Sequence, residues 1–217
     1  MTCNINYNIV STGSKGNAVV INKFLLIDCG VPFKQLGPFY RDLKLVLLTH
    51  IHSDHFNRTT IRKLANERPL LRWACCRWLV SALVECNVEP SNIDILECGI
   101  QYDYGIVAVE PVKLTHNVPN CGYKLFFKRG GKLFYATDTN SLSGITATNF
   151  DLYMVEANHE EAEIKERIKE KKAAGLYAYE MQAVKNHLSK EKCDNWIYSN
   201  IGPTGSYIYL HNHVDDD

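Results

Sequence analysis

The sequence predicts an α/β fold with two β-sheets inside and helices packed outside. Short apolar runs separated by turn residues fill the first half, a β-rich stretch follows, and helix-like segments alternate with strands in the last third. Strands and helices mixed in this order are typical of sheets covered by helices. The 217 residues contain no linker-like or low-complexity stretch, so we expect one domain over residues 1–217.

The first half is expected to hold short strands and two helices. The run at 43–50 is too short and too uniformly apolar for a surface helix, which predicts a buried strand. A helix is expected over 57–66, because Pro69 disfavours its continuation. The full set for this half is strands over 7–11, 18–22, 24–30, 43–50 and 70–76, and helices over 57–66 and 77–86.

The second half is expected to be richer in strands. Two apolar runs over 123–138 flank Gly130-Gly131, and a Gly-Gly pair between such runs indicates a hairpin. Further strands are expected over 105–116, 151–157 and 206–211. The charged segment 159–172 is expected to be helical, and 180–197 is expected to contain another helix.

Composition favours a globular protein that works in the cytosol. Apolar residues make up 46% and charged residues 22%, and no apolar run approaches the ~20 residues that a membrane span needs. The N-terminus lacks the features of a signal peptide, so we expect a cytoplasmic location and no membrane partner. The 8 cysteines form no C-x-x-C pair and several lie in apolar runs, which indicates reduced, buried thiols.

The formal charge is zero, so no overall field draws the protein onto nucleic acid. One stretch, 58–77, is locally basic and is opposed only by Glu67. Its cations are Arg58, Arg62, Lys63, Arg68, Arg72 and Arg77. The stretch can be a solvated surface or a phosphate-binding patch, and the sequence leaves both interpretations open.

The strongest chemical signal follows the predicted strand at 43–50. Three of the chain's 8 histidines and one aspartate fall within six positions, as His50, His52, Asp54 and His55. In an extended segment alternate side chains point the same way, so His50 and His52 can bind one ion together. The chain then turns, which lets Asp54 and His55 face a second ion. Such a pair of metal ions turns water into a hydroxide nucleophile near neutral pH.

This segment resembles the H-x-H-x-D-H signature of the metallo-β-lactamase superfamily, and the likeness extends along almost the whole chain. The resemblance implies a four-layer αββα sandwich. It implies that Asp28, in an Asp-Cys-Gly turn, lies beside the metals. It places His116 as the third histidine of the first metal and Asp138 as the carboxylate that bridges both metals.

Within the superfamily the chain resembles the YycJ (WalJ) group of cytosolic nucleases. Three segments carry this likeness: STGSKGNAVVI, DLYMVEANHEE and NHLSK. The last two align loosely with the HEAT and HST motifs of RNase Z. That likeness implies that His187 is the general acid and Glu156 its orienting partner. Asn140 and Glu160 depart from the group, which commonly has glycine and aspartate there.

The resemblance also implies a complete ligand set for two divalent metal ions. The first metal takes His50, His52 and His116, the second takes Asp54, His55 and His211, and Asp138 bridges. His213 is the alternative to His211 as the last ligand. Asp54 is a candidate to orient the attacking hydroxide or take its proton. Nitrogen and oxygen donors without thiolate suit zinc or manganese, Zn²⁺ or Mn²⁺.

The function that this resemblance implies is hydrolysis of a phosphodiester by metal-activated hydroxide, with DNA attacked from a 5′ end as the first substrate. The interval between Asp138 and His211 is filled by core elements, which excludes the large inserted domain of RNase J. One alternative is a cyclic-nucleotide phosphodiesterase. Others are a thioester or β-lactam hydrolase on the same fold, and a non-catalytic binding protein.

Overall fold

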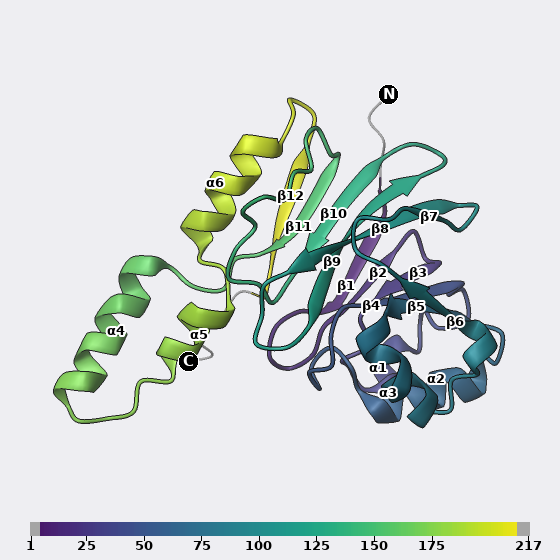
Figure 1. Ribbon diagram of the computed structural model, residues 1–217, viewed down its shortest axis with the longest axis horizontal. Helices are drawn as coiled ribbons and strands as arrows, with labels where there is room; N and C mark the ends of the chain where they lie inside the picture. The colour runs from purple at the N-terminus through teal and green to yellow at the C-terminus, as the bar shows by residue number, and fades with distance from the viewer. Residues whose placement is uncertain (1–4, 212–217) are drawn as a thin grey trace. The chain divides into compact units, whose positions relative to one another are not determined.

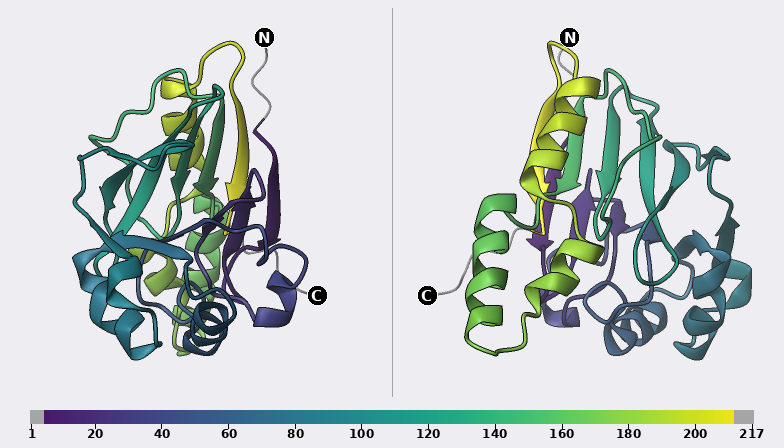
Figure 2. Two further views of the ribbon diagram at one scale, coloured as in Figure 1. Left: turned by 90° about the vertical axis from the view of Figure 1, so that its right-hand side faces the viewer. Right: turned by 60° about the vertical axis from the view of Figure 1, so that its left-hand side comes forward.

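The computed structural model describes residues 5–211, which fall into two compact units, residues 5–102 and residues 103–211. Figures 1 and 2 show the helices and strands of both units. His213, the alternative to His211 as the last ligand, lies outside the described residues. No helix between residues 5 and 211 is long and apolar enough to cross a membrane.

The N-terminal unit contains one mixed sheet of six strands in the order β1-β2-β3-β4-β5-β6. The first three strands pair antiparallel, and β3 to β6 run parallel. The strands are β1 (Tyr7–Ser11), β2 (Ala18–Ile21), β3 (Leu25–Ile27), β4 (Leu45–Leu48), β5 (Arg72–Cys76) and β6 (Ile93–Leu96). The helices are α1 (Phe33–Leu36), α2 (Arg58–Glu67), η1 (Arg77–Leu79), α3 (Val80–Glu85) and η2 (Pro90–Asn92).

The core of this unit follows from its apolar pattern. All four residues of β4 are buried, as its uniformly apolar sequence predicted. Helix α2 begins at the N-cap Asn57, whose side chain accepts a hydrogen bond from Thr60 N, and it buries Ile61 and Leu64. These side chains join the hydrophobic cluster beneath the sheet.

The C-terminal unit contains a second mixed sheet of six strands in the order β12-β11-β10-β9-β8-β7. Strands β8, β9 and β10 pair antiparallel, whereas β10, β11 and β12 run parallel. The strands are β7 (Tyr102–Asp103), β8 (Val107–Leu114), β9 (Asn120–Phe127), β10 (Lys132–Ala136), β11 (Leu152–Glu156) and β12 (Ser206–Leu210). The helices are α4 (Glu161–Ala173), α5 (Glu180–Asn186) and α6 (Lys190–Asn200).

The hairpin predicted at Gly130-Gly131 is confirmed. Phe127 N donates to Gly131 O over 2.9 Å, and both glycines have positive φ, at 94° and 95°. A residue with a Cβ atom adopts this left-handed region only at a cost, which explains why glycine occupies both positions. The turn sets the register that pairs Leu125 with Leu133.

The segment 180–197 holds two helices, α5 and α6, where the sequence indicated one. Between them His187 has extended backbone, with φ −127° and ψ 153°. Ser189 then caps α6, because its side chain accepts a hydrogen bond from Lys192 N. The break gives His187 a place off the helix, and α6 packs against β11 through its buried face, as the right-hand view of Figure 2 shows.

No disulfide joins any cysteines among residues 5–211, and six of the seven described thiols are buried. Burial raises the pKa of the Cys29 and Cys193 thiols well above the ordinary value. Burial, with the nearby carboxylate of Asp94, raises the pKa of Cys75 to about 12. These thiols are therefore protonated and unreactive at neutral pH.

Candidate metal centre

The histidine-rich segment of the N-terminal unit begins directly after β4. His50 is fully buried, and its Nε2 atom lies 3.1 Å from Nδ1 of His52. Two nitrogens that share a tetrahedral zinc at about 2.1 Å are separated by roughly 3.4 Å. The two rings therefore stand close to the spacing that a shared ion requires.

Asp28 lies at the carboxyl end of the neighbouring parallel strand β3, and its side chain contacts this segment. Its Oδ2 atom lies 2.7 Å from His55 Nδ1, so the imidazole N–H donates to a fully buried carboxylate. Its Oδ1 atom accepts from Thr49 N over 2.9 Å and from Thr49 Oγ1 over 3.0 Å. Thr49 Oγ1 is in turn 2.9 Å from His50 Nδ1. One carboxylate thus orients two histidines of the segment.

Asn17 contacts the same segment and was not recognised in the sequence. Its side-chain nitrogen lies 2.8 Å from His55 Nε2, and its oxygen accepts from Gly13 N over 2.9 Å. The second contact fixes the orientation of the amide, so the amide nitrogen donates to the lone pair of His55 Nε2. A metal ion bound at His55 would take this lone pair and replace the hydrogen bond from Asn17.

Gly30 is a second residue that sequence reasoning passed over. A Cβ atom at this position would lie 1.7 Å from Asp54 O and 2.7 Å from His55 N. Only glycine lets the turn after β3 approach the ligand segment so closely. The signal was present, because Gly30 closes the Asp-Cys-Gly turn that contains Asp28.

In the C-terminal unit the sheet topology brings three candidate residues to one edge. Asp138 follows β10, Glu156 ends β11 and His211 follows β12, and these three strands run parallel. Carboxyl ends of parallel strands meet at the same edge of a sheet. Asp138 and His211 leave their strands with positive φ, 56° and 52° respectively, which turns their side chains out of the strand pattern.

The Asp138 carboxylate lies among three histidines. Its Oδ1 atom is 3.6 Å from Nδ1 of both His187 and His211, and 3.9 Å from Nε2 of His116. His116 donates its Nδ1–H to Asn186 O over 3.1 Å, so its Nε2 lone pair is directed at the carboxylate. This orientation suits a metal ligand.

Glu156 joins the two remaining histidines. Its Oε1 atom lies 2.5 Å from His187 Nδ1 and 3.0 Å from His211 Nδ1, and its Oε2 atom accepts from Thr139 N over 3.0 Å. Burial raises the pKa of this carboxyl, but the hydrogen bonds from His187 and His211 hold its pKa below the ordinary value. Glu156 is therefore ionised at neutral pH, and each histidine directs an N–H toward it.

The donor set of this unit fits a divalent metal ion. Ligand atoms from Asp138, Glu156, His187 and His211 all lie within 4.8 Å of one another, and three of these four residues are buried. The donors are imidazole nitrogens and carboxylate oxygens, which suit Zn²⁺ or Mn²⁺ as the sequence indicated.

The basic stretch 58–77 makes its contacts inside the N-terminal unit. Arg58 pairs with Glu85 over 2.8 Å, Arg72 pairs with Asp94, and Arg68 donates to the carbonyl of Leu43 over 2.8 Å. Lys63 lies over the ring of Phe33, 4.6 Å from its centroid. These contacts favour the view that the stretch 58–77 is a solvated surface whose cations stabilise the fold, rather than a phosphate-binding patch.

The two departures from the YycJ pattern form local contacts. Asn140 donates its side-chain N–H to Lys185 O over 2.7 Å, and so links the turn after β10 to α5. Glu160 pairs with Lys190 over 3.3 Å. Asn120, also unrecognised in the sequence, is buried and donates to Thr137 O and Asp138 O, which fixes the backbone of the predicted bridging residue.

Comparison with known proteins places the chain in a family. Residues 23–186 match the model of the beta-lactamase superfamily domain. The exodeoxyribonuclease WalJ of Streptococcus pneumoniae is 26% identical over 228 aligned positions, which cover 94% of this chain and 80% of that protein.

Two solved structures share the fold at low sequence identity. The metallo-β-lactamase fold protein YhfI from Bacillus subtilis has a TM-score of 0.73 at 13% identity, over 96% of this chain and 86% of that chain. Human tRNase Z, short form, has a TM-score of 0.68 at 15% identity, over 95% and 92%. The predicted fold is therefore confirmed, as an α/β metallo-β-lactamase fold with two mixed sheets and flanking helices. The chain belongs to the metallo-β-lactamase superfamily.

Proposed function

We propose that this protein is a metal-dependent phosphodiester hydrolase that degrades DNA from a 5′ end. The observation that carries the proposal is the contact of buried Glu156 with both His187 and His211. This arrangement holds the His187 imidazole, which can deliver a proton, at the same sheet edge as Asp138 and His211, which can bind a metal ion. The likeness to the exodeoxyribonuclease WalJ of Streptococcus pneumoniae supports DNA as the substrate.

We propose that the ligand set implied by the family holds two divalent ions in this chain. The ligands are His50, His52, Asp54, His55, His116, Asp138 and His211. When bound, two such ions acidify water and neutralise the charge that builds on the phosphoryl oxygens. Asp28 and Asn186 fix ring orientation within their own units, because each accepts an N–H from one of these histidines.

The proposed acid is His187. Its Nδ1–H donates to Glu156, which leaves Nε2 as the atom that carries the transferable proton to the leaving oxygen. The Glu156 carboxylate fixes the orientation of the His187 ring, as a partner of a general acid does. Asp54, whose carboxylate is partly exposed, is proposed to orient the attacking water or take its proton.

A time course on 5′-labelled DNA, single- and double-stranded, with Mn²⁺ or Zn²⁺, tests the proposal. We expect short labelled products from the wild type and none from Asp138→Ala. Exposed Asp103 supplies a matched control, because Asp103→Ala removes a surface carboxylate that pairs with exposed Lys128 and accepts a hydrogen bond from Gly105 N. Intact DNA in the presence of metal-loaded wild type would overturn the nuclease assignment.

A cyclic-nucleotide phosphodiesterase is the second candidate function. One observation favours it: Arg58, Arg68 and Arg72 bind partners inside their own unit, so this stretch does not present a set of free cations to a polyanion. The same metals and the same acid would serve a small cyclic substrate. Hydrolysis of a cyclic nucleotide by protein that leaves labelled DNA intact would select this function.

A further inference from the structure

Strand β5 of the N-terminal unit ends beside the strand that leads into the histidine segment. β5 runs parallel to β4, and the register pairs Leu48 with Cys75 near their carboxyl ends. Carboxyl ends of parallel strands meet at one edge of a sheet, and ligands of such sheets bind at that edge. There β4 leads into His50, whereas β5 leads into Arg77 and Trp78. A cation and an aromatic residue therefore share this edge with proposed metal ligands.

Trp78 is fixed to the histidine segment by a hydrogen bond. Its Nε1–H donates to Thr49 O over 3.2 Å, and Thr49 directly precedes His50. Thr49 is itself held in place, because its backbone N–H and its hydroxyl donate to buried Asp28. Trp78 is nevertheless 36% exposed. An indole that is anchored through its N–H keeps one ring orientation while part of its surface faces solvent.

The other two tryptophans are used inside the fold. Trp73 is only 1% exposed, and the ring centroid of Trp196 lies 4.7 Å from that of Phe134 and 6.0 Å from that of Tyr153. Trp78 makes no ring–ring or cation–π contact in the described part of the chain. A fixed, partly exposed indole without an aromatic neighbour can stack with a nucleic-acid base.

Arg77 differs from three other arginines of this unit. Arg58, Arg68 and Arg72 all bind acceptors within the unit. The exposed Arg77 side chain has no ion-pair or hydrogen-bond partner within residues 5–211. Its backbone is fixed, because Arg77 O accepts a hydrogen bond from Val80 N. A single unpaired guanidinium at this edge suits one phosphate group, which it can bind through two N–H donors.

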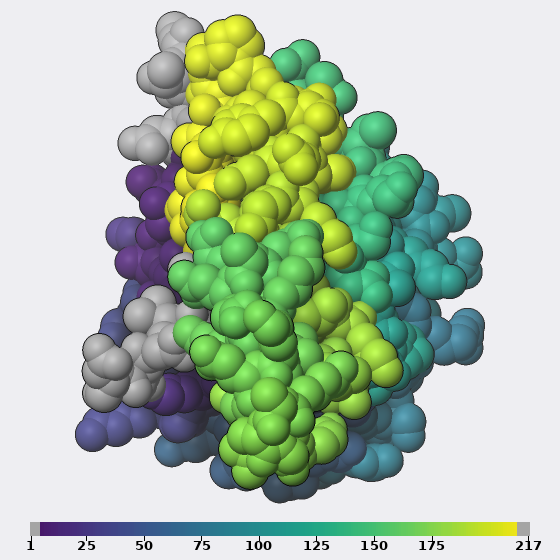
Figure 3. Space-filling view, turned by 90° about the vertical axis from the view of Figure 1, so that its left-hand side faces the viewer, coloured from purple at the N-terminus to yellow at the C-terminus, as the bar shows by residue number. Residues whose placement is uncertain are grey.

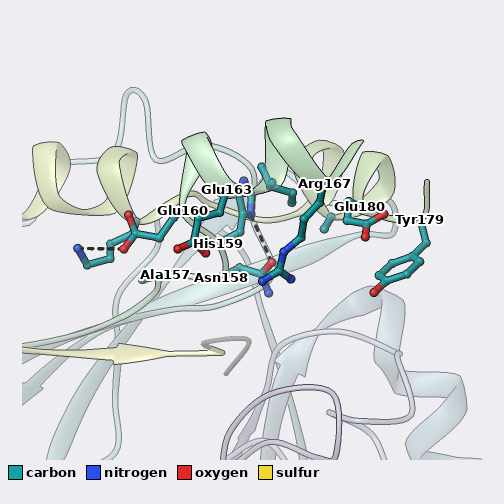
Figure 4. A pocket seen from close by; sticks show the side chains of 11 residues that line it. Ala157, Asn158, His159, Glu160, Glu163, Arg167, Tyr179 and Glu180 are labelled. Carbon is teal, nitrogen blue, oxygen red and sulfur yellow. Dashed lines mark hydrogen bonds and ion pairs between the residues drawn. The ribbon is translucent and has the colours of Figure 1, made fainter. Parts of the chain in front are cut away.

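The cavity of the C-terminal unit, about 270 Å³ in volume, offers less to a phosphate. Figure 4 shows its wall, which comes from the segment after β11, from α4 and from the start of α5. Figure 3 shows the outer face of this unit, where α4 (green) lies below α6 (yellow). Lys190 in the wall pairs with Glu160 over 3.3 Å, and Lys171 pairs with Glu180. These lysines are therefore engaged with carboxylates and not available to an anion.

We propose that Arg77 and Trp78 form a subsite for one nucleotide of the substrate strand, in which Trp78 stacks on the base and Arg77 binds a phosphate of the same nucleotide. This assignment rests on the proposed action on DNA. Neither contact selects a base, because every base has a π-face and phosphate contacts carry no sequence information. Stacking on the indole needs a base whose face is not covered by its neighbours, so the subsite favours a single strand over a duplex.

Equilibrium binding tests the base contact without the reaction. The probe is a short single-stranded phosphorothioate oligonucleotide, which resists hydrolysis, with a 3′ fluorescein. Fluorescence anisotropy gives its Kd for the full chain loaded with Mn²⁺, and an abasic residue is moved one position at a time along the strand. At one position we expect loss of the base to weaken binding to the wild type about tenfold, but binding to Trp78→Leu by less than about twofold.

Trp78→Phe separates stacking from a structural role of the indole. Phenylalanine keeps a flat ring but lacks the N–H that binds Thr49 O. We expect Trp78→Phe to keep at least about a threefold dependence on the base. Bound metal, measured by mass spectrometry, should stay constant in both Trp78 variants. The matched control Tyr177→Leu removes a ring that is 77% exposed in the C-terminal unit, and it should keep the full dependence.

Salt dependence tests the phosphate contact. Arg77→Gln should reduce the slope of log Kd against log salt concentration by about 0.7, which is the share of one phosphate contact on a single strand. Arg129→Gln makes the same change at an exposed arginine between β9 and β10, and it should leave the slope unchanged. A duplex of the same sequence should bind more weakly to the wild type than the single strand.

Failure of the subsite and failure of the proposed function give different results. A base dependence that is equal in wild type and Trp78→Leu, or a salt slope unchanged in Arg77→Gln, overturns the subsite even where labelled DNA is cleaved. Absence of oligonucleotide binding to the wild type overturns it as well. Loss of metal in Trp78→Phe and Trp78→Leu alike, with the base dependence retained, would assign the indole to holding the segment instead. Loss of the base dependence in Trp78→Leu together with the reduced slope in Arg77→Gln supports the subsite even where labelled DNA stays intact.

Discussion

The two units orient histidines by the same device but assemble it differently. In the N-terminal unit buried Asp28 contacts His55 and, through Thr49, His50. In the C-terminal unit buried Glu156 contacts His187 and His211. Both carboxylates stand at the carboxyl end of a parallel strand. The first group joins Asp28 to one short segment that holds Thr49, His50 and His55, whereas Glu156, His187 and His211 come from three separate segments.

The difference lies in what each carboxylate can do. Asp28 is enclosed by backbone and side-chain donors and serves only to hold rings in place. Glu156 holds rings too, but one of them, His187, is partly exposed and can exchange a proton. We therefore expect changes in the first group to act through metal binding, and changes in the second to act on turnover as well.

The largest loss of hydrolysis is expected on removal of a proposed metal ligand. Asp138→Ala should reduce hydrolysis to background, and His52→Ala should do the same from the N-terminal unit, because both remove proposed ligands. Metal content by mass spectrometry and turnover measure the result, with circular dichroism as the control for folding. Activity retained in either variant would remove the two-metal mechanism.

His187→Ala comes next in size. Loss of a general acid should lower turnover by roughly 10²–10⁴-fold while bound metal stays constant. The pH profile should lose its descending limb, because no group remains that must be protonated for the leaving oxygen to depart. A fall in metal content in place of this pattern would reassign His187 as a ligand.

Asp28→Asn should have a smaller effect, and it should lower metal affinity rather than turnover. The amide keeps the shape but turns a donor toward His55 or Thr49, so metal affinity should fall about 10–100-fold. Turnover at saturating metal should recover to nearly the wild-type value. The matched change Glu156→Gln should not recover in this way, and equal recovery in both variants would erase the distinction between the two carboxylates.

The smallest effect is expected at the basic stretch. Arg58 and Arg62 contact Glu85 on α3. Exposed ion pairs of this kind contribute little to the stability of the fold, so their loss should leave the protein folded. Arg58→Ala combined with Arg62→Ala should change the KM for DNA by less than about twofold. A large rise in KM that weakens with added salt would show that these cations reach phosphates, and would restore the phosphate-binding interpretation.

Sequence patterns predicted the strands with strong local signals. The uniformly apolar β4 and the Gly-Gly hairpin between β9 and β10 were expected close to their observed bounds. The short edge strand β6 and the break at His187 were not, because a four-residue strand and an extended residue between two helical segments carry little periodicity.

The candidate site divides in the same way. The residues from His50 to His55 lie together in the sequence, and their spacing alone predicts a metal site. Asp138, Glu156, His187 and His211 came only from the family resemblance, since tertiary structure alone brings them together. Asn17 and Asn120 escaped notice because an asparagine whose side chain donates to backbone carbonyls looks, in sequence, like any loop residue.

Asp28, Asp138 and His211 all have left-handed backbone, with φ of 59°, 56° and 52°. Glycine adopts this conformation at less cost than any of them, although aspartate and histidine tolerate it better than most residues. Glycine would relieve this backbone cost, but it would also remove the buried hydrogen bonds that Asp28 and His211 make. The left-handed backbone at these strand ends is therefore retained for the side chains that it directs, and their hydrogen bonds offset its conformational cost.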